Sequence, residues 1–277
     1  MATTATESKE LIHDAHDAGD DEPKRQGAFS FYREEVADLV RMIARTFYYT
    51  FRGKREKGAV VRQCFAIGNQ SMFFMAVTMG FIGAIVLYQM CMQAKRIIPD
   101  LTMIGGMYLK LLLRELAPSV GAMPLATRVG AGIAAEIGSM VVTEQTDALR
   151  MSGADPVDYL VVPRVIAATI MCTAVLVLGA VFAYFAGMAV AVNSFDVNMH
   201  SFINLSDVTW RDVTLGFIKC IFYGAAIALV SCHRGLRTFG GSEGVGVATT
   251  QAVVGSLFCV IILNFILSAI GHIVLPP

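Results

Sequence analysis

Charged side chains are scarce in this sequence of 277 residues. Asp, Glu, Lys and Arg make up 16% of it, with 22 basic and 22 acidic residues, whereas hydrophobic residues make up 55% and the mean hydropathy is +0.60. A typical soluble domain has about 25% charged and about 45–50% apolar residues. The scarcity of charge excludes a disordered chain and a nucleic-acid-binding protein with a basic surface, and it argues against an ordinary cytosolic enzyme. An integral membrane protein remains.

Several chemical motifs are also missing. The six cysteines are scattered without a CxxC pair, so we expect small buried hydrophobic side chains rather than metal ligands. His13 and His16 have no further ligand cluster nearby, and no metal site is predicted there. The segment 231–250 is rich in glycine, but the chain has no G-x-x-x-x-G-K-[ST] motif. We expect a flexible, tightly turning loop rather than a nucleotide site.

The positions of the charges divide the chain into membrane spans. Residues 63–94, 165–195 and 244–277 contain no Asp, Glu, Lys or Arg. A spanning helix needs about 20 mostly apolar residues, so each run accommodates one span. Two further apolar stretches carry a few charges. The prediction is an all-α integral membrane protein with five spans, at about 66–92, 103–135, 160–192, 213–232 and 247–274.

Basic residues predict the orientation, because Lys and Arg mark the cytoplasmic side. Eight of them lie within residues 33–62, directly before the first span, which places the N-terminus in the cytoplasm and, after five spans, the C-terminus in the periplasm. The first 28 residues lack an apolar h-region, so we expect no cleavable signal peptide. The eight are Arg33, Arg41, Arg45, Arg52, Lys54, Arg55, Lys57 and Arg62.

Two segments precede the first span. Residues 1–28 are polar and acidic, which is typical of a disordered tail. Residues 29–62 have aromatic and aliphatic residues at roughly helical spacing, with arginines and acids between them. This pattern predicts an amphipathic helix in the membrane interface with its arginines toward anionic headgroups. A soluble helix packed on a partner is the alternative.

The segment 136–164 predicts a short helix outside the membrane. Thr143 with Glu144, Asp147 and Arg150 after it resembles a capped helix start, and Gly153 can end the helix. We therefore expect a helix over about 143–152 on the cytoplasmic face. It either presents the membrane domain to a soluble partner or is a surface loop that happens to be helical.

The second span is the unusual one. Lys110 and Arg114 share a helix face, and Glu115 follows. Pro118 and Pro124 predict a kink or break. Ionisable residues at membrane depth are costly and tend to face a cavity, so these charges either line a cavity for a polar headgroup or extend toward the interface.

A stripe of small residues follows the prolines. Gly130, Ala134 and Gly138 recur every four residues, which places them on one face of a helix. Small residues at this spacing let neighbouring membrane helices approach closely. We expect this stripe to be a helix-packing face.

Two long blocks resemble a known family. The run RELAPSVGAMPLATRVGAGIAAEIGSMVVTEQTDALRMSGADPVDYLVVPR (114–164) is similar to the signature of the MlaE/YrbE permeases, and GGSEGVGVATTQAVV (240–254) is similar to their second signature. The resemblance implies that 63–277 is a permease domain, the membrane subunit of an ATP-binding-cassette lipid transporter in the bacterial inner membrane. The expected partners are a second permease copy, a cytoplasmic ATPase dimer, a periplasmic MCE-domain protein and phospholipid cargo.

The resemblance also assigns roles to residues. We expect no catalytic residue, no metal and no cofactor in this chain, with ATP and Mg in the partner ATPase. Thr143, Glu144, Gln145, Asp147 and Arg150 would form the helix that couples to the ATPase. The expected lipid cavity combines the Arg-Glu pair with apolar residues of the first span: Arg114, Glu115, Phe74, Val77, Phe81, Leu87 and Tyr88.

Other readings of the sequence remain. The cargo could be a sterol or another hydrophobic compound, and the sequence encodes neither the transport direction, nor the MCE architecture, nor homodimer against heterodimer. A secondary transporter driven by an ion gradient is a rival, although coupling charges in several spans would then be expected and no inverted repeat is visible. A membrane scaffold is another rival, but it would not need a charged, proline-broken second span.

Overall fold

The computed structural model describes residues 28–52, 58–96, 103–203 and 208–274. Within these ranges every regular element is a helix, and five helical segments are long and apolar enough to cross a membrane. The predicted all-α class and the five spans are therefore confirmed. The predicted tail, apart from Ala28, lies outside the described residues, as do His13 and His16.

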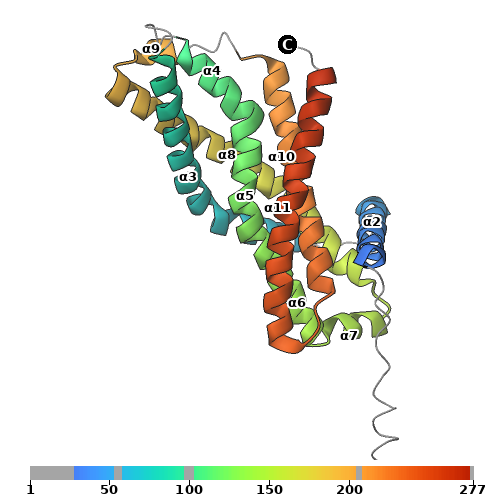
Figure 1. Ribbon diagram of the computed structural model, residues 1–277. Helices are drawn as coiled ribbons and strands as arrows, with labels where there is room; N and C mark the ends of the chain where they lie inside the picture. Colours follow the sequence, from blue (N-terminus) through green and yellow to red (C-terminus); the bar gives the residue numbers. More distant parts are fainter. Residues whose placement is uncertain (1–27, 53–57, 97–102, 204–207, 275–277) are drawn as a thin grey trace, which may run out of the picture. The chain divides into compact units, whose positions relative to one another are not determined.

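The long helices are single elements, and the second span is a series of short ones (Figure 1). The helices and their bounds are α2 (Ala28–Arg52), α3 (Ala59–Ala94), α4 (Ile104–Leu111), η1 (Leu112–Val120), α5 (Gly121–Leu125), η2 (Ala126–Gly130), α6 (Ala131–Val142), α7 (Gln145–Met151), η3 (Val157–Val161), α8 (Val162–Phe195), α9 (Met199–Phe202), α10 (Trp210–Leu236) and α11 (Gly241–Val274).

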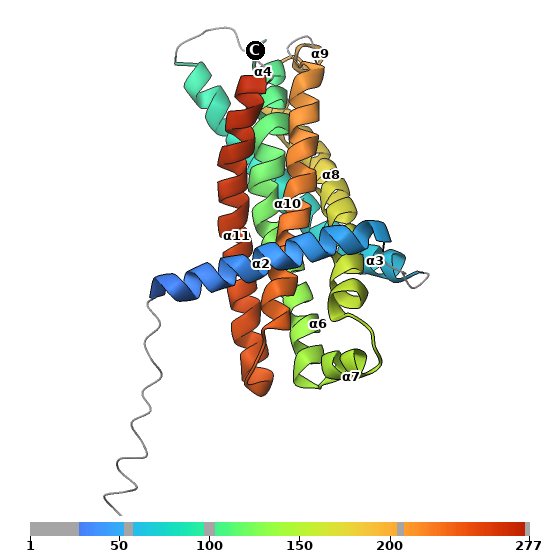
Figure 2. The same cartoon turned by 90° about the vertical axis from the view of Figure 1, so that its right-hand side faces the viewer.

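From Met42 onward the chain forms one compact unit, and its spans alternate in direction. The ends of α3, α8 and α11 lie at one end of this bundle, together with α9 and the starts of α4 and α10 (Figures 1 and 2). The helix α7 and the turn between α10 and α11 lie at the opposite end (Figures 1 and 2). We call these the α9 end and the α7 end.

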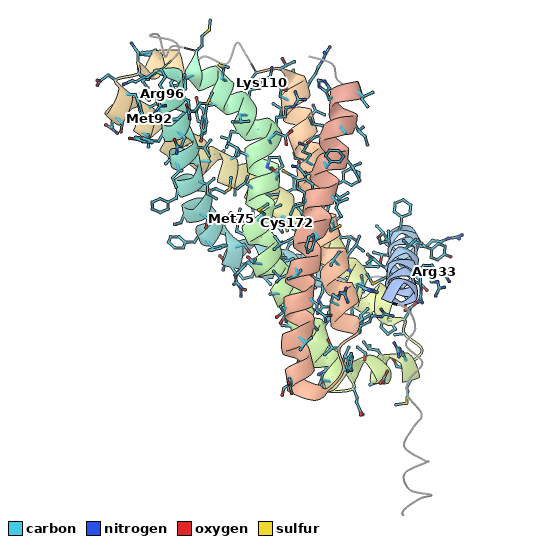
Figure 3. All side chains as sticks on the ribbon, viewed as in Figure 1. Arg33, Met75, Met92, Arg96, Lys110 and Cys172 are labelled. Carbon is cyan, nitrogen blue, oxygen red and sulfur yellow. The ribbon has the colours of Figure 1, made fainter. Side chains whose placement is uncertain are left out.

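Small residues hold α3 against α8, which is the most extensive helix pairing in the bundle. A Cβ atom added to Gly83 would lie 2.6 Å from the carbonyl oxygen of Ala183, so the two backbones touch at this level. Close approach of this kind supplies van der Waals packing, which drives helix association where lipid removes the hydrophobic driving force. Met75 and Cys172 lie inside the bundle, whereas Arg96 and Lys110 lie at its α9 end (Figure 3).

The second span is continuous but irregular. Two π-helical stretches, η1 and η2, flank α5, and Pro118 and Pro124 lie within η1 and α5. Proline has no N–H to give to the preceding turn, and a π-helical turn relieves this misfit without breaking the helix. Thr127 follows the second proline, and its hydroxyl donates to the carbonyl of Pro124 at 2.8 Å, three residues back along the same segment. At the predicted break the second span therefore stays helical, with locally wider turns.

The glycine-rich segment differs from its prediction. Gly244 and Gly246 lie inside α11, and only residues 237–240 connect α10 to α11. The expectation of a flexible loop is therefore wrong for most of this segment. Gly240 and Gly241 have φ values of 85° and 72°, which favour glycine, so the tight turn needs just these two.

Helix ends also shift from the predicted bounds. Residues 59–62, which were assigned to the interfacial segment, belong to α3, and α2 ends at Arg52. All six cysteines are free thiols, four of them buried and two half-buried. This agrees with their expected place among the apolar side chains of the spans.

Candidate functional site

An ion cluster occupies the bundle between η1, α10 and α11. Lys219 is fully buried, at 0% exposure. Its ammonium group lies 2.8 Å from Oε1 of Glu115 and donates to Ser268 Oγ at 2.8 Å and to the carbonyl of Arg114 at 3.1 Å. All three N–H donors of the lysine therefore have partners, which offsets part of the cost of removing its charge from water.

Asp212 completes this cluster at the start of α10. Its carboxylate lies 3.6 Å from Arg114 and 4.0 Å from Lys110, and it accepts a hydrogen bond from the backbone N–H of Thr209 at 3.3 Å. It thus neutralises two cations of the second span and caps a helix. We define the ion cluster as Lys110, Arg114, Glu115, Asp212 and Lys219.

Polar side chains of α11 extend the ion cluster. Ser268 donates to Glu115, and Tyr223 donates to Asn264 Oδ1 at 2.9 Å. The sequence predicts Lys110, Arg114 and Glu115 as members of the site, but not Asp212, Tyr223, Asn264 and Ser268. The sequence does show Lys219 as the single charged residue of the predicted span 213–232. Tyr223, Asn264 and Ser268 carry no sequence signal, because a single polar residue in an apolar helix has no pattern of its own, whereas Asp212 belongs to a Thr209-x-x-Asp212 capping pattern.

The apolar residues predicted for the lipid cavity divide into two groups. Phe74, Val77, Phe81 and Tyr88 are exposed along one face of α3, with Phe81 at 68%. Leu87 is at 0% exposure, inside the bundle, and its assignment to the cavity surface is wrong. One residue along a helix rotates a side chain by about 100°, so Leu87 and Tyr88 face different surroundings.

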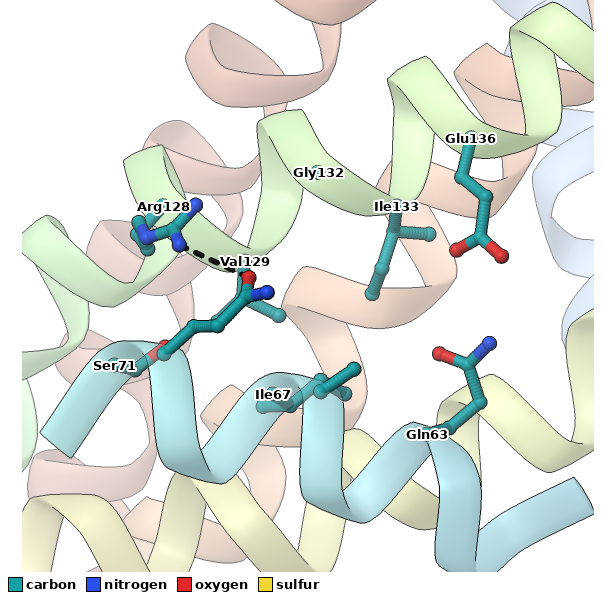
Figure 4. A pocket seen from close by; sticks show the side chains of 10 residues that line it. Gln63, Ile67, Ser71, Arg128, Val129, Gly132, Ile133 and Glu136 are labelled. Carbon is teal, nitrogen blue, oxygen red and sulfur yellow. Dashed lines mark hydrogen bonds between the residues drawn. The ribbon is translucent and has the colours of Figure 1, made fainter.

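A second polar region lies nearer the α7 end, between α3 and the η2–α6 segment (Figure 4). Arg128 donates to Gln70 Oε1 at 3.0 Å, and Glu136 lies two turns further along the second span. We define the Arg128 cleft by its polar and small lining residues Gln63, Gln70, Ser71, Arg128, Gly132 and Glu136.

Glu136 also joins this cleft to α8. Its carboxylate lies 2.8 Å from Arg164, whose side chain is nearly fully buried and donates to the carbonyl of Leu160 at 2.9 Å. The Glu136 side chain remains 45% exposed. One face of the carboxylate therefore neutralises a buried arginine while the other faces the cleft.

The predicted coupling residues lie around α7, at the α7 end of the bundle. Glu144, Gln145, Asp147 and Arg150 are exposed, and Asp147 pairs with Arg150 at 3.2 Å. The predicted role of Thr143 as the helix cap is wrong. Its hydroxyl donates back to the carbonyl of Ser139 at 2.9 Å and closes α6.

Backbone turns, rather than a side-chain cap, set the limits of α7. Glu144 precedes the helix with a left-handed φ of 58° and has no side-chain capping bond. At the other end, Gly153 N–H donates to Arg150 and Ala154 N–H to Leu149, at 3.0 and 3.1 Å. This is a Schellman ending with glycine in the left-handed region, as the sequence indicated for Gly153.

The small-residue stripe runs from the end of η2 into α6 and lies against α10 and the turn that follows it. A Cβ on Gly138 would lie 2.8 Å from the Thr238 hydroxyl, and one on Gly130 would lie 3.0 Å from the Ser231 hydroxyl. Ala134 between them is fully buried. The stripe thus connects α7, through α6, to the turn between α10 and α11.

Five apolar spans that enclose an ion cluster define a multi-pass membrane protein. The family model described as Permease MlaE matches residues 60–270. A probable ABC transporter permease protein of Synechocystis is 38% identical over 246 residues, which cover 87% of this chain and 92% of that protein. The chain therefore belongs to the MlaE permease family.

Two further relatives carry more descriptive names. The intermembrane phospholipid transport system permease protein MlaE of Haemophilus influenzae is 30% identical over 250 residues, which cover 86% of this chain and 94% of the relative. The chloroplastic protein trigalactosyldiacylglycerol 1 of Arabidopsis thaliana is 35% identical over 225 residues, which cover 79% of this chain and 63% of that protein.

Proposed function

We propose that this chain is the permease subunit of an ATP-binding-cassette transporter that moves phospholipid between the inner and outer bacterial membranes. The observation that carries the proposal is membership of the MlaE permease family, together with similarity over most of the chain to a permease of an intermembrane phospholipid transport system. The chain lies in the inner membrane with its α7 end in the cytoplasm. It works as one of two copies, with an ATPase dimer and an MCE-domain protein.

The exposed stripe on α3 supports a lipid cargo. Phe74, Val77, Phe81 and Tyr88 form an apolar face that stays exposed among the described residues of the bundle. A large uncovered apolar face in a membrane protein contacts lipid or another membrane helix. Acyl chains of the cargo lie against this face, and Arg114 and Glu115 lie near its headgroup at the α9 end.

The helix α7 is the docking element for the ATPase. Its charged residues are exposed, and it packs on α6, so a push on α7 is transmitted along the second span. ATP and Mg bind in the partner. Closure of the two ATPase subunits displaces the α7 helices of both permease copies, and the two permeases shift against each other and expel the lipid toward the MCE protein.

The docking role is tested by reversing charge on α7. Glu144→Lys combined with Asp147→Lys should abolish co-purification of the ATPase and lipid transport, because both side chains are exposed and neither holds the fold. Arg96→Glu, an exposed charge change at the α9 end, is the matched control. Intact co-purification and transport in the double variant would show that docking occurs elsewhere.

The cargo is tested by crosslinking. A photoreactive residue at Phe81 or Tyr88 should capture phospholipid that remains bound through detergent purification. The same residue at Phe185, exposed on α8, reports on loosely held bilayer lipid. Labelling at Phe185 without labelling at Phe81 and Tyr88 would contradict a cargo path along α3.

A further inference from the structure

The Arg128 cleft is separate from the ion cluster and has no part in the mechanism above. Its volume is about 150 Å³. Pockets that enclose a drug-sized ligand measure about 300–1,000 Å³, so this cleft has room for a small polar group rather than for a whole lipid.

The polar groups of the cleft stand at its two ends. Arg128 and Gln70 occupy one end, and Glu136 and Gln63 point toward each other at the other (Figure 4). Arg128 and Glu136 are eight residues apart, which is about 12 Å along a helix. A single small ion cannot contact both, but a molecule with an anionic group at one end and hydrogen-bond donors at the other can.

The floor between these ends is apolar. Ile67, Val129 and Ile133 line it and are buried. Gly132 lies at the same level, and a Cβ atom added there would meet no other atom within 4 Å. The middle of the cleft therefore suits a short hydrocarbon bridge between two polar ends, and Gly132 keeps the space above the floor open.

Both ends retain unused bonding capacity. An arginine has five N–H donors, and the bond to Gln70 uses one of them. A carboxylate has about four acceptor sites, and Glu136 uses one oxygen for Arg164. The arginine end thus attracts a phosphodiester, in the geometry that guanidinium groups favour, and the Glu136 end attracts a donor group.

The cleft continues directly into the apolar stripe. Gln63, Ala66 and Gln70 are followed on the same face of α3 by Phe74, Val77 and Phe81, at steps of three and four residues. A lipid with its headgroup in the cleft has its acyl chains along this stripe. This continuity favours a lipid headgroup over a free phosphate ion.

We propose that the Arg128 cleft binds the headgroup of a glycerophospholipid whose phosphodiester is followed by hydrogen-bond donors, as in phosphatidylethanolamine and phosphatidylglycerol. The phosphodiester binds Arg128, and the terminal ammonium or hydroxyl group donates to Glu136 and to the amide oxygen of Gln63. Phosphatidylcholine has no such donor and binds less well. The inference rests on the proposed lipid transport and adds a headgroup site nearer the α7 end.

Two variants test the cleft by independent means. Arg128→Gln removes the charge, and Gly132→Leu fills the open space without meeting another atom at Cβ. Arg62→Gln is the matched control, because Arg62 is an exposed arginine beside Gln63 that does not line the cleft. Thermal unfolding of each purified full-length variant verifies folding.

The measurement is native mass spectrometry of the full chain in detergent, with phosphatidylethanolamine, phosphatidylglycerol and phosphatidylcholine of identical acyl chains. Loss of a hydrogen bond to a charged group weakens binding roughly tenfold or more. We expect this loss for the first two lipids in Arg128→Gln and Gly132→Leu, and wild-type affinity in Arg62→Gln.

Three results would overturn the assignment, and they are distinguishable. Unchanged binding in both cleft variants would disprove the site while leaving the proposed function intact. Equal binding of phosphatidylcholine by the wild-type protein would disprove the donor requirement at Glu136. Failure of the wild-type protein to retain any phospholipid would contradict the site and the proposed lipid cargo together.

Discussion

The ion cluster and the Arg128 cleft lie along the same span, but their charged side chains differ in burial and in hydrogen bonding. In the ion cluster, Lys219 is buried with all its donors bonded, and Asp212 faces two cations. In the cleft, Arg128 and Glu136 are both partly exposed and keep unused donors and acceptors. One region has its bonding capacity nearly filled by the protein, and the other presents its capacity to the outside.

A charge at membrane depth is therefore not by itself a sign of a cargo path. A buried and fully bonded charge fixes helices relative to one another, as Lys219 does for η1, α10 and α11. A partly exposed charge in a cleft is available to a ligand. The two regions should therefore respond differently to substitution, one in stability and the other in binding.

The largest effect is expected at Lys219. Lys219→Met leaves Glu115 without its ammonium partner; breaking a fully buried ion pair from one side typically costs about 3–5 kcal/mol, and the 33% exposure of Glu115 places the loss toward the lower end of that range. Thermal or SDS-induced unfolding of the purified protein measures this loss. Lys219→Met combined with Glu115→Gln should recover most of it, because no uncompensated charge remains. A single variant as stable as the wild-type protein would remove the distinction between the two regions.

A smaller effect is expected at Asp212. Asp212→Ala removes the acceptor for the Thr209 N–H at the start of α10 and the partner of Lys110 and Arg114, whose side chains can still reach water. Loss of a helix cap costs about 0.5–2 kcal/mol. The same unfolding assay applies, and Asp212→Asn should retain part of the stability because its amide oxygen still accepts the cap bond. Equal losses of stability in Asp212→Ala and Asp212→Asn would show that the charge of Asp212 stabilises the protein and that the cap bond does not.

The smallest loss of stability is expected in the cleft. Arg128→Gln should stay within about 0.5 kcal/mol of the wild-type protein, because substitutions at exposed positions away from packed contacts rarely exceed that range. Gly132→Leu should lose no stability, because Gly132 lies in α6 and leucine is a better helix former than glycine by up to about 1 kcal/mol. The same unfolding assay measures these variants, and the loss found for Lys219→Met is the value with which they are compared. A loss of several kcal/mol in either cleft variant would mean that the cleft, like the ion cluster, is structural.

Much of the fold was predictable because a membrane restricts the choices. The lack of charge in residues 63–94, 165–195 and 244–277 predicted three spans directly. The end of α7 was predicted correctly, since Gly153 does terminate it. Its start was predicted at about residue 143, whereas the helix begins at Gln145. Thr143 matches the sequence pattern of a helix cap, and whether its hydroxyl bonds forward or back depends on the backbone turn at Glu144, which the pattern does not encode.

A five-span membrane protein of the MlaE permease family is predictable from the sequence alone, because hydropathy and two long ordered motifs are local properties of the chain. The pairing of the charged side chains, in contrast, depends on the tertiary structure. Lys219 lies more than a hundred residues from Glu115 along the chain, and Gln70 lies 58 residues from Arg128. The tertiary structure also determines that Leu87 is buried while Tyr88 is exposed, because only the packing of α3 against its neighbours distinguishes two adjacent apolar residues.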